Sequence, residues 1–228
     1  MFNDKKALLL DMNSTFMFGE DRFGENEDFF TYYKKAGGSF KKKELNHIIM
    51  YAYEYLDIRY SDEKYRHNFP SLKQAIEKSH DVEISKDEIE KIIDTFAFHE
   101  LGYIPQEFIS VLHKLKERFI LAAVIDIWSP KKPWLETFEK AGISKLFSAS
   151  SFSSDHGMVK PSPKPFELVV NQLNLRKEEC LVIGDSERRD LGAAIAAGID
   201  CILVGGASSP RAAGCYLNLV EFSNEIQE

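Results

Sequence analysis

Cysteine is scarce in this chain, with three in 228 residues. Cys180, Cys201 and Cys215 are odd in number and lack the paired spacing of a zinc site, which argues against a disulfide framework and against a thiolate metal centre. Cys180 and Cys201 lie in apolar runs that are typical of strands. We interpret the thiols as core side chains of a protein in a reducing compartment.

Long hydrophobic runs are also missing. No stretch approaches the roughly 18 apolar residues of a membrane-spanning helix, and the run ALLL near the start is too short for a secretory signal. We therefore expect a cytoplasmic protein that has no membrane partner. Hydrophobic residues make up 44% of the chain and charged residues 29%, which is ordinary for a globular protein.

Positive charge is in deficit, because the formal net charge is −7. Binding to nucleic acid requires clustered Lys and Arg side chains, so the balance argues against a nucleic-acid partner. A small molecule is the expected partner, and a monomer and a homodimer both fit the sequence.

Five short apolar runs are spaced along the chain with helix-like stretches between most of them. Near-continuous apolarity over such runs favours parallel strands that are covered on both faces. Alternating strands and helices predict a doubly wound α/β sheet, a Rossmann-like fold that binds ligands at the carboxyl ends of its strands. The expected strands are residues 7–11, 119–126, 145–150, 180–185 and 201–205, and the expected helices are 105–118, 131–142, 163–175 and 187–198.

A block of helical patterns interrupts this alternation. Residues 16–104 contain helix-like stretches at 27–37, 42–60, 71–80 and 85–101, and Ser85 with Glu88 has the spacing of a capping box. We expect 1–15 and 105–228 to form the α/β core and 16–104 to form a helical cap over its active edge. The glycine-containing segments 19–26 and 102–105 are the expected hinges.

Charged side chains stand where the sheet edge is expected. Asp11 ends the run LLLD, Asp185 ends CLVIGD, Asp190 follows in GDSERRD, and Lys160 precedes a helix in GMVKPSPKPFE. In a doubly wound sheet these four residues would converge at one edge.

In this order the motifs resemble those of haloacid dehalogenase-like hydrolases. The first motif of that family, Asp-x-Asp-x-Thr or Val, matches Asp11-Met12-Asn13-Ser14-Thr15. Its third motif, a lysine before Pro-x-Pro, matches Lys160-Pro161-Ser162-Pro163. Its fourth motif matches Gly184-Asp185 through Asp190, and continues into the sequence AAIAAG. The helical block then corresponds to the helical cap of the family.

The resemblance implies a Mg²⁺-dependent phosphatase-type hydrolase that acts on a small phosphorylated metabolite. Asp11 would attack phosphorus and form an aspartyl phosphate, and Lys160 would supply positive charge beside it. Asp11, the Asn13 carbonyl and Asp185 would hold Mg²⁺, with Asp190 supporting the site. Thr15 is a candidate substrate contact in the first motif.

Asn13 departs from the family pattern, which has a second aspartate there. That aspartate protonates the leaving oxygen and then activates water, and an amide does neither. The family resemblance with Asn13 therefore implies slow hydrolysis, unless the leaving group needs little protonation or another residue, such as Glu20 or His47, supplies the acid.

A second departure lies in FILAAVIDIWSP, where the family places a Ser or Thr that binds the phosphoryl group. Counting from Arg118 assigns that position to Ile125, with Asp126 following, whereas a register four residues later assigns it to Ser129. Asp126 and Ser129 are the candidate substrate contacts in this motif.

Two other functions remain open. A catalytically impaired pseudoenzyme or binding module of the same fold is favoured by Asn13 and Ile125 and opposed by the retained Asp11 and Lys160. Cleavage of a carbon–halogen or carbon–phosphorus bond is opposed by the retained pair Asp185 and Asp190.

Overall fold

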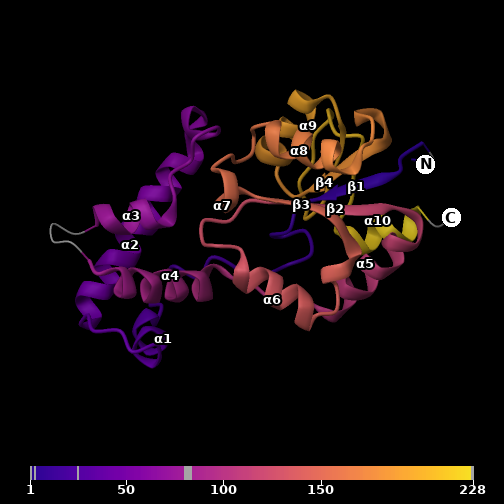
Figure 1. The fold of residues 1–228 in the computed structure, drawn as a ribbon. Helices are drawn as coiled ribbons and strands as arrows, with labels where there is room; N and C mark the ends of the chain where they lie inside the picture. Colours follow the sequence, from indigo (N-terminus) through magenta and orange to yellow (C-terminus); the bar gives the residue numbers. More distant parts are fainter. Residues whose placement is uncertain (1, 3, 25, 80–83, 227–228) are drawn as a thin grey trace.

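A six-stranded parallel sheet forms the centre of the α/β part of the chain (Figure 1). The computed structural model describes residues 2, 4–24, 26–79 and 84–226. The strands follow the order β3-β2-β1-β4-β5-β6, so β1 lies between β2 and β4. Their bounds are β1 Ala7–Leu10, β2 Ile120–Ile125, β3 Phe147–Phe152, β4 Cys180–Gly184, β5 Asp200–Leu203 and β6 Gly214–Cys215.

Helices cover both faces of this sheet. Alternate residues of β1 point to opposite faces, so Leu8 and Leu10 pack in one hydrophobic cluster while Ala7 and Leu9 pack in another. The helices α5 and α10 lie on one side and α8 and α9 on the other (Figure 1). Their bounds, with those of the other helices of this part, are α5 Gln106–Arg118, α6 Lys132–Lys140, α7 Ser153–His156, α8 Lys164–Leu173, α9 Gly192–Ala197 and α10 Leu219–Glu225.

The doubly wound α/β fold predicted from the apolar runs is therefore confirmed. The predicted third strand is shifted by two residues, because residues 144–146 form the 3-10 turn η2 (Ser144–Leu146) instead of starting the strand. Gly198 ends α9 in the left-handed conformation with φ 73°, as the glycine after AAIAA predicted. None of the helices in the described ranges combines the length and apolarity needed to cross a membrane.

The segment between β1 and α5 is helical and has a hydrophobic cluster of its own. Phe29, Ile48, Ile76 and Phe96 are among the buried members of that cluster, one from each helix. Ser85 is the N-cap of α4, and its hydroxyl accepts the Glu88 backbone N–H, which is one of the two hydrogen bonds of the expected capping box. The Glu88 carboxylate accepts the Ser39 backbone N–H instead of completing the box. The bounds are α1 Phe29–Lys35, α2 Lys42–Ser61, η1 Glu63–Tyr65, α3 Leu72–Lys78 and α4 Lys86–Glu100; residue 80 of the third expected helix is outside the described ranges.

Two chain segments join this helical part to the sheet, and they run side by side. Phe18 and Tyr103 exchange backbone hydrogen bonds of 2.9 and 2.8 Å. Gly19 follows with φ +68°, and a Cβ there would lie 2.9 Å from the Tyr103 ring, so the close approach requires glycine. Residue 25 of the expected hinge 19–26 lies outside the described ranges.

Candidate active site

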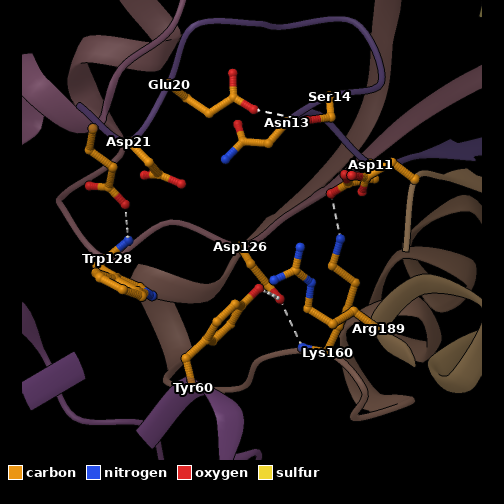
Figure 2. A pocket seen from close by; sticks show the side chains of 12 residues that line it. Asp11, Asn13, Ser14, Glu20, Asp21, Tyr60, Asp126, Trp128, Lys160 and Arg189 are labelled. Atoms are coloured by element: carbon orange, nitrogen blue, oxygen red, sulfur yellow. Dashed lines mark hydrogen bonds and ion pairs between the residues drawn. The ribbon is translucent and has the colours of Figure 1, made fainter. Parts of the chain in front are cut away.

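Three aspartates stand side by side at the carboxyl edge of the sheet. Asp11 follows β1, Asp126 follows β2 and Asp185 follows β4, and these three strands are neighbours. They border a cavity of about 160 Å³, shown in Figure 2. The cavity is lined by Asp11, Asn13, Ser14, Glu20, Asp21, Tyr60, Glu100, Asp126, Trp128, Lys160, Asp185 and Arg189.

Asp11 and Lys160 form a buried ion pair at the floor of the cavity. Asp11 is 6% exposed and Lys160 is 2% exposed. The Lys160 ammonium donates to Asp11 Oδ1 and, at 2.7 Å, to Asp190 Oδ1. Burial raises the pKa of Asp11 to about 7, although Lys160 opposes this.

Lys160 remains a cation in this setting. Burial alone would lower the pKa of Lys160, but the carboxylates of Asp11, Asp190 and Asp126 raise it well above its usual value. The ammonium is thus a fixed positive charge beside the candidate nucleophile.

A carboxylate cluster beside this pair fits a divalent cation. Asp11, Asp185 and Asp190 each place one oxygen within 4.8 Å of the others. Oxygen donors of this kind suit Mg²⁺. Asn13 lines the same cavity, and its carbonyl as a further ligand stays a prediction.

Gly184 makes room for this cluster. A Cβ on Gly184 would lie 2.3 Å from Asp190 Cγ, so a larger residue would displace the carboxylate. Asp190 Oδ2 accepts the Ser186 backbone N–H at 3.0 Å, which fixes its orientation.

The side chain of Asn13 faces the cavity without a hydrogen bond. Its Oδ1 is buried and has no partner among the described residues, and the same holds for Glu20 Oε2. The other Glu20 oxygen accepts the Ser14 hydroxyl at 3.2 Å (Figure 2). Of the two candidate replacement acids, Glu20 lines the cavity, whereas His47 is exposed on α2 and is absent from the lining.

The candidates of the second motif differ in where their side chains lie. Ile125 is the last residue of β2. Side chains along a strand alternate between the two faces of the sheet, and this alternation places Ile125 in the hydrophobic cluster on one face. Ser129 is buried and does not line the cavity. Asp126, the first residue after the strand, takes the place at the edge.

One oxygen of Asp126 is already occupied by hydrogen bonds, while Oδ1 has no partner among the described residues. Its Oδ2 accepts the Tyr60 hydroxyl and the Lys160 backbone N–H, each at 2.9 Å. Burial raises the pKa of Asp126. Thr15 is buried at 1% exposure and is not among the lining residues, so the structure does not bring it to the cavity.

Several lining residues were missed by the sequence reasoning because they come from the helical part or the loops around it. Tyr60 lies in the last turn of α2 and reaches Asp126. Glu100 ends α4 and accepts the backbone N–H groups of Trp128 at 2.5 Å and Ser129 at 2.9 Å. The helical periodicity gave no sign of which residues face the sheet. Arg189 lay within the motif GDSERRD, where its charge beside the aspartates was the available signal.

Comparison with known proteins assigns the family. A family model for haloacid dehalogenase-like hydrolases matches residues 5–198, which is most of the chain. The chain therefore belongs to the haloacid dehalogenase-like hydrolases, and the resemblance carried by its motifs is confirmed.

Curated relatives match a shorter segment. The chain is 44% identical over 61 residues to a phosphoglycolate phosphatase from Yersinia pestis, which is 27% of this chain and 26% of that protein. A phosphoglycolate phosphatase from Photorhabdus laumondii subsp. laumondii is 45% identical over 60 residues, which is 26% of this chain and 25% of that protein. The chain spans about a quarter of the length of the curated relatives it matches.

Solved structures match nearly the whole chain. A HAD phosphatase from Thermococcus onnurineus has a TM-score of 0.64 at 20% identity and covers 97% of both chains. A 2-haloacid dehalogenase from Pseudomonas syringae pv. Tomato DC3000 also has a TM-score of 0.64, at 16% identity, and covers 98% of both chains. At these identities the likeness shows the shared fold, which serves a phosphatase and a dehalogenase alike.

Proposed function

We propose that this protein is a cytoplasmic, Mg²⁺-dependent phosphatase that acts on a small phosphorylated metabolite. The observation that carries the proposal is the buried pair of Asp11 and Lys160 next to the three-carboxylate cluster of Asp11, Asp185 and Asp190. A carboxylate nucleophile approaches an anionic phosphoryl group only where positive charge offsets the repulsion. The cluster argues against a dehalogenase, which needs no divalent cation.

The reaction would proceed in two steps. An Asp11 oxygen attacks phosphorus, the bond to the leaving oxygen breaks, and the phosphoryl group is held on the carboxylate. Water then attacks the aspartyl phosphate and releases inorganic phosphate. Lys160 neutralises charge beside Asp11, and bound Mg²⁺, held by Asp11, Asp185, Asp190 and the Asn13 carbonyl, would offset charge on the phosphoryl oxygens.

Asn13 sets the expected substrate preference. An alkoxide leaving group needs a proton as its bond to phosphorus breaks, whereas the carboxylate that leaves an acyl phosphate largely does not. Because general acid–base catalysis contributes roughly 10²–10⁴-fold, alkyl phosphates should be hydrolysed slowly and acyl phosphates faster. Asn13 lines the cavity, and its amide cannot serve as a general acid, which supports this preference.

The Asn13→Asp variant tests the proposal. It should raise the turnover of an alkyl phosphate by roughly 10²-fold or more and change the turnover of acetyl phosphate much less. Steady-state phosphate release with Mg²⁺ measures both, and Asp11→Asn, which should abolish both, controls for contaminating phosphatases.

Three results would change this interpretation. An equal gain on both substrates would show that the proton comes from another group. Fast hydrolysis of alkyl phosphates by the unchanged sequence would do the same. Phosphate binding with no turnover of either substrate would identify the binding module instead.

We also propose that residues 16–104 act as a mobile cap that closes over Asp11. Support comes from the separate hydrophobic cluster of α1–α4 and from the contacts that cross the cavity. The Tyr60 hydroxyl donates to Asp126, and Trp128 packs against the rings of Tyr60 and Phe69. Closure would exclude water from the aspartyl phosphate.

A further inference from the structure

The cavity contains many acids and few cations for a site that receives a phosphoryl group. Lys160 is one of its two cationic side chains, and it is already paired with Asp11 and Asp190. Neither candidate for the family's hydroxyl position lines the cavity, because Ile125 packs in the core and Ser129 is absent from the lining. Asp126 lines it, and its Oδ2 accepts the Tyr60 hydroxyl and the Lys160 backbone N–H. The acids in the described lining are Asp11, Glu20, Asp21, Glu100, Asp126 and Asp185. Apart from the proposed Mg²⁺, an incoming phosphoryl group can therefore gain positive charge from one further side chain of the described lining.

Arg189 is the remaining cation of the described lining, and its side chain forms no ion pair there. Figure 2 shows its guanidinium pointing into the cavity between Asp11 and Asp126. A guanidinium is charged at all ordinary pH values, so Arg189 offers a permanent positive charge.

The backbone after β4 aims this side chain. Residues Glu187–Leu191 form the π-helical turn η4, and the Ser186 hydroxyl accepts the Arg189 backbone N–H at 3.2 Å. Turns of this type are rare and occur often at functional sites. Within the turn, neighbouring arginines diverge, and Arg188 donates to the backbone carbonyls of Ser61 at 2.8 Å and Tyr60 at 3.1 Å.

The helical part also holds the guanidinium in place. Arg189 Cζ lies 5.2 Å from the centre of the Tyr60 ring, within the range of a cation–π contact. A guanidinium restricted in this way retains a planar set of N–H donors that matches two phosphate oxygens at once.

We infer that Arg189 binds the non-bridging oxygens of the substrate's phosphoryl group and replaces the hydroxyl that the second motif lacks. This inference rests on the proposed phosphatase function. In this inference Arg189 binds the phosphoryl group that is transferred, and it does not bind the rest of the substrate.

Calorimetric titration with inorganic phosphate in the presence of Mg²⁺ tests the inference without requiring the natural substrate. A hydrogen bond to a charged group contributes about 1.5–3 kcal/mol, so Arg189→Gln should weaken phosphate binding by roughly 10- to 100-fold. Arg189→Lys keeps the charge and loses the paired donors, so its loss should be smaller. Arg188→Gln is the matched control, because it removes the contact with α2 and leaves the inward-facing arginine.

The outcomes are separable. Equal phosphate affinity in Arg189→Gln and the unchanged protein would refute the inference while the phosphatase proposal stands. An equal loss of phosphate affinity in Arg188→Gln would also refute the inference, because the effect would then come from the position of α2. A loss seen with 2-phosphoglycolate and not with inorganic phosphate would assign Arg189 to a distant carboxylate instead. No phosphate binding by the unchanged protein would refute the phosphatase proposal together with this inference.

Discussion

Glu100 links the helical part to the sheet, and its protonation should control the stability of the protein. It is the last residue of α4 and is 4% exposed. Its two oxygens accept the backbone N–H groups of Trp128 and Ser129 in the loop after β2. Burial raises the pKa of Glu100 to about 7 from the usual 4.5, more than the bonds from Ser129 and Trp128 lower it.

The sign of the effect follows from the two states. Between pH 4.5 and 7 the folded chain keeps this proton and the unfolded chain loses it, so the free energy of unfolding falls as the pH rises. From pH 5 to pH 8 the loss that this group contributes is about 2.5 kcal/mol. Because Glu100 is buried, solvent and salt reduce this contribution to the free energy of unfolding only slightly.

The Glu100→Gln variant removes the titration and keeps the shape of the side chain. We expect the unfolding free energy of the unchanged protein, minus that of the variant, to fall by about 2–3 kcal/mol between pH 5 and 8. Urea unfolding at several pH values measures this difference, in which the other titrating groups cancel. Glu90→Gln, at an exposed position on α4, is the matched control.

A constant difference between the Glu100→Gln variant and the unchanged protein over this pH range would refute the reasoning. It would mean that Glu100 is charged in the folded state throughout, held as an anion by the two N–H donors.

Two further predictions concern the metal and the cap. Asp185→Ala should weaken Mg²⁺ binding in calorimetric titration by removing one oxygen of the three-carboxylate cluster, and unchanged affinity would take Asp185 out of the site. In a Trp134→Phe background, the fluorescence of Trp128, which contacts Tyr60 and Phe69, should change when phosphate and Mg²⁺ close the cap; a signal that does not respond would contradict closure.

The centre of the sheet could be predicted from the sequence because β1, β2 and β4 are runs of nearly consecutive apolar residues. β3 mixes serines with apolar residues, and its predicted start was two residues early. β6 was missed, since it contains two residues, Gly214 and Cys215, and two residues show no periodicity. The aspartates after β1 and β4 were placed correctly at the sheet edge because the ends of apolar runs mark the ends of strands.

The rest of the site depends on packing between distant segments. At the end of β2, Ile125 lies in the core and the next residue, Asp126, lines the cavity. A prediction of the cavity residue must therefore place the end of the strand to within one residue, and strand ends predicted from sequence are less accurate than that. Tyr60 and Glu100 lie in the last turns of helices whose periodicity was recognised, but which end of each helix faces the sheet is decided by tertiary contacts alone. Arg189 was visible as a charge, and its direction is set by the π-helical turn.

The position of β1 between β2 and β4 has a consequence for the order in which the protein folds during synthesis. Asp11 is synthesised before both strands that flank its own, because β1 pairs on one side with Ile120–Ile125 and on the other with Cys180–Gly184. The helices from Phe29 to Glu100 can bury their own apolar surface while the nascent chain still lacks those partners. Long-range strand pairing is slow because a large loop must close first. The carboxylate that starts the chemistry therefore becomes part of the active site only after the strand Cys180–Gly184 has been synthesised.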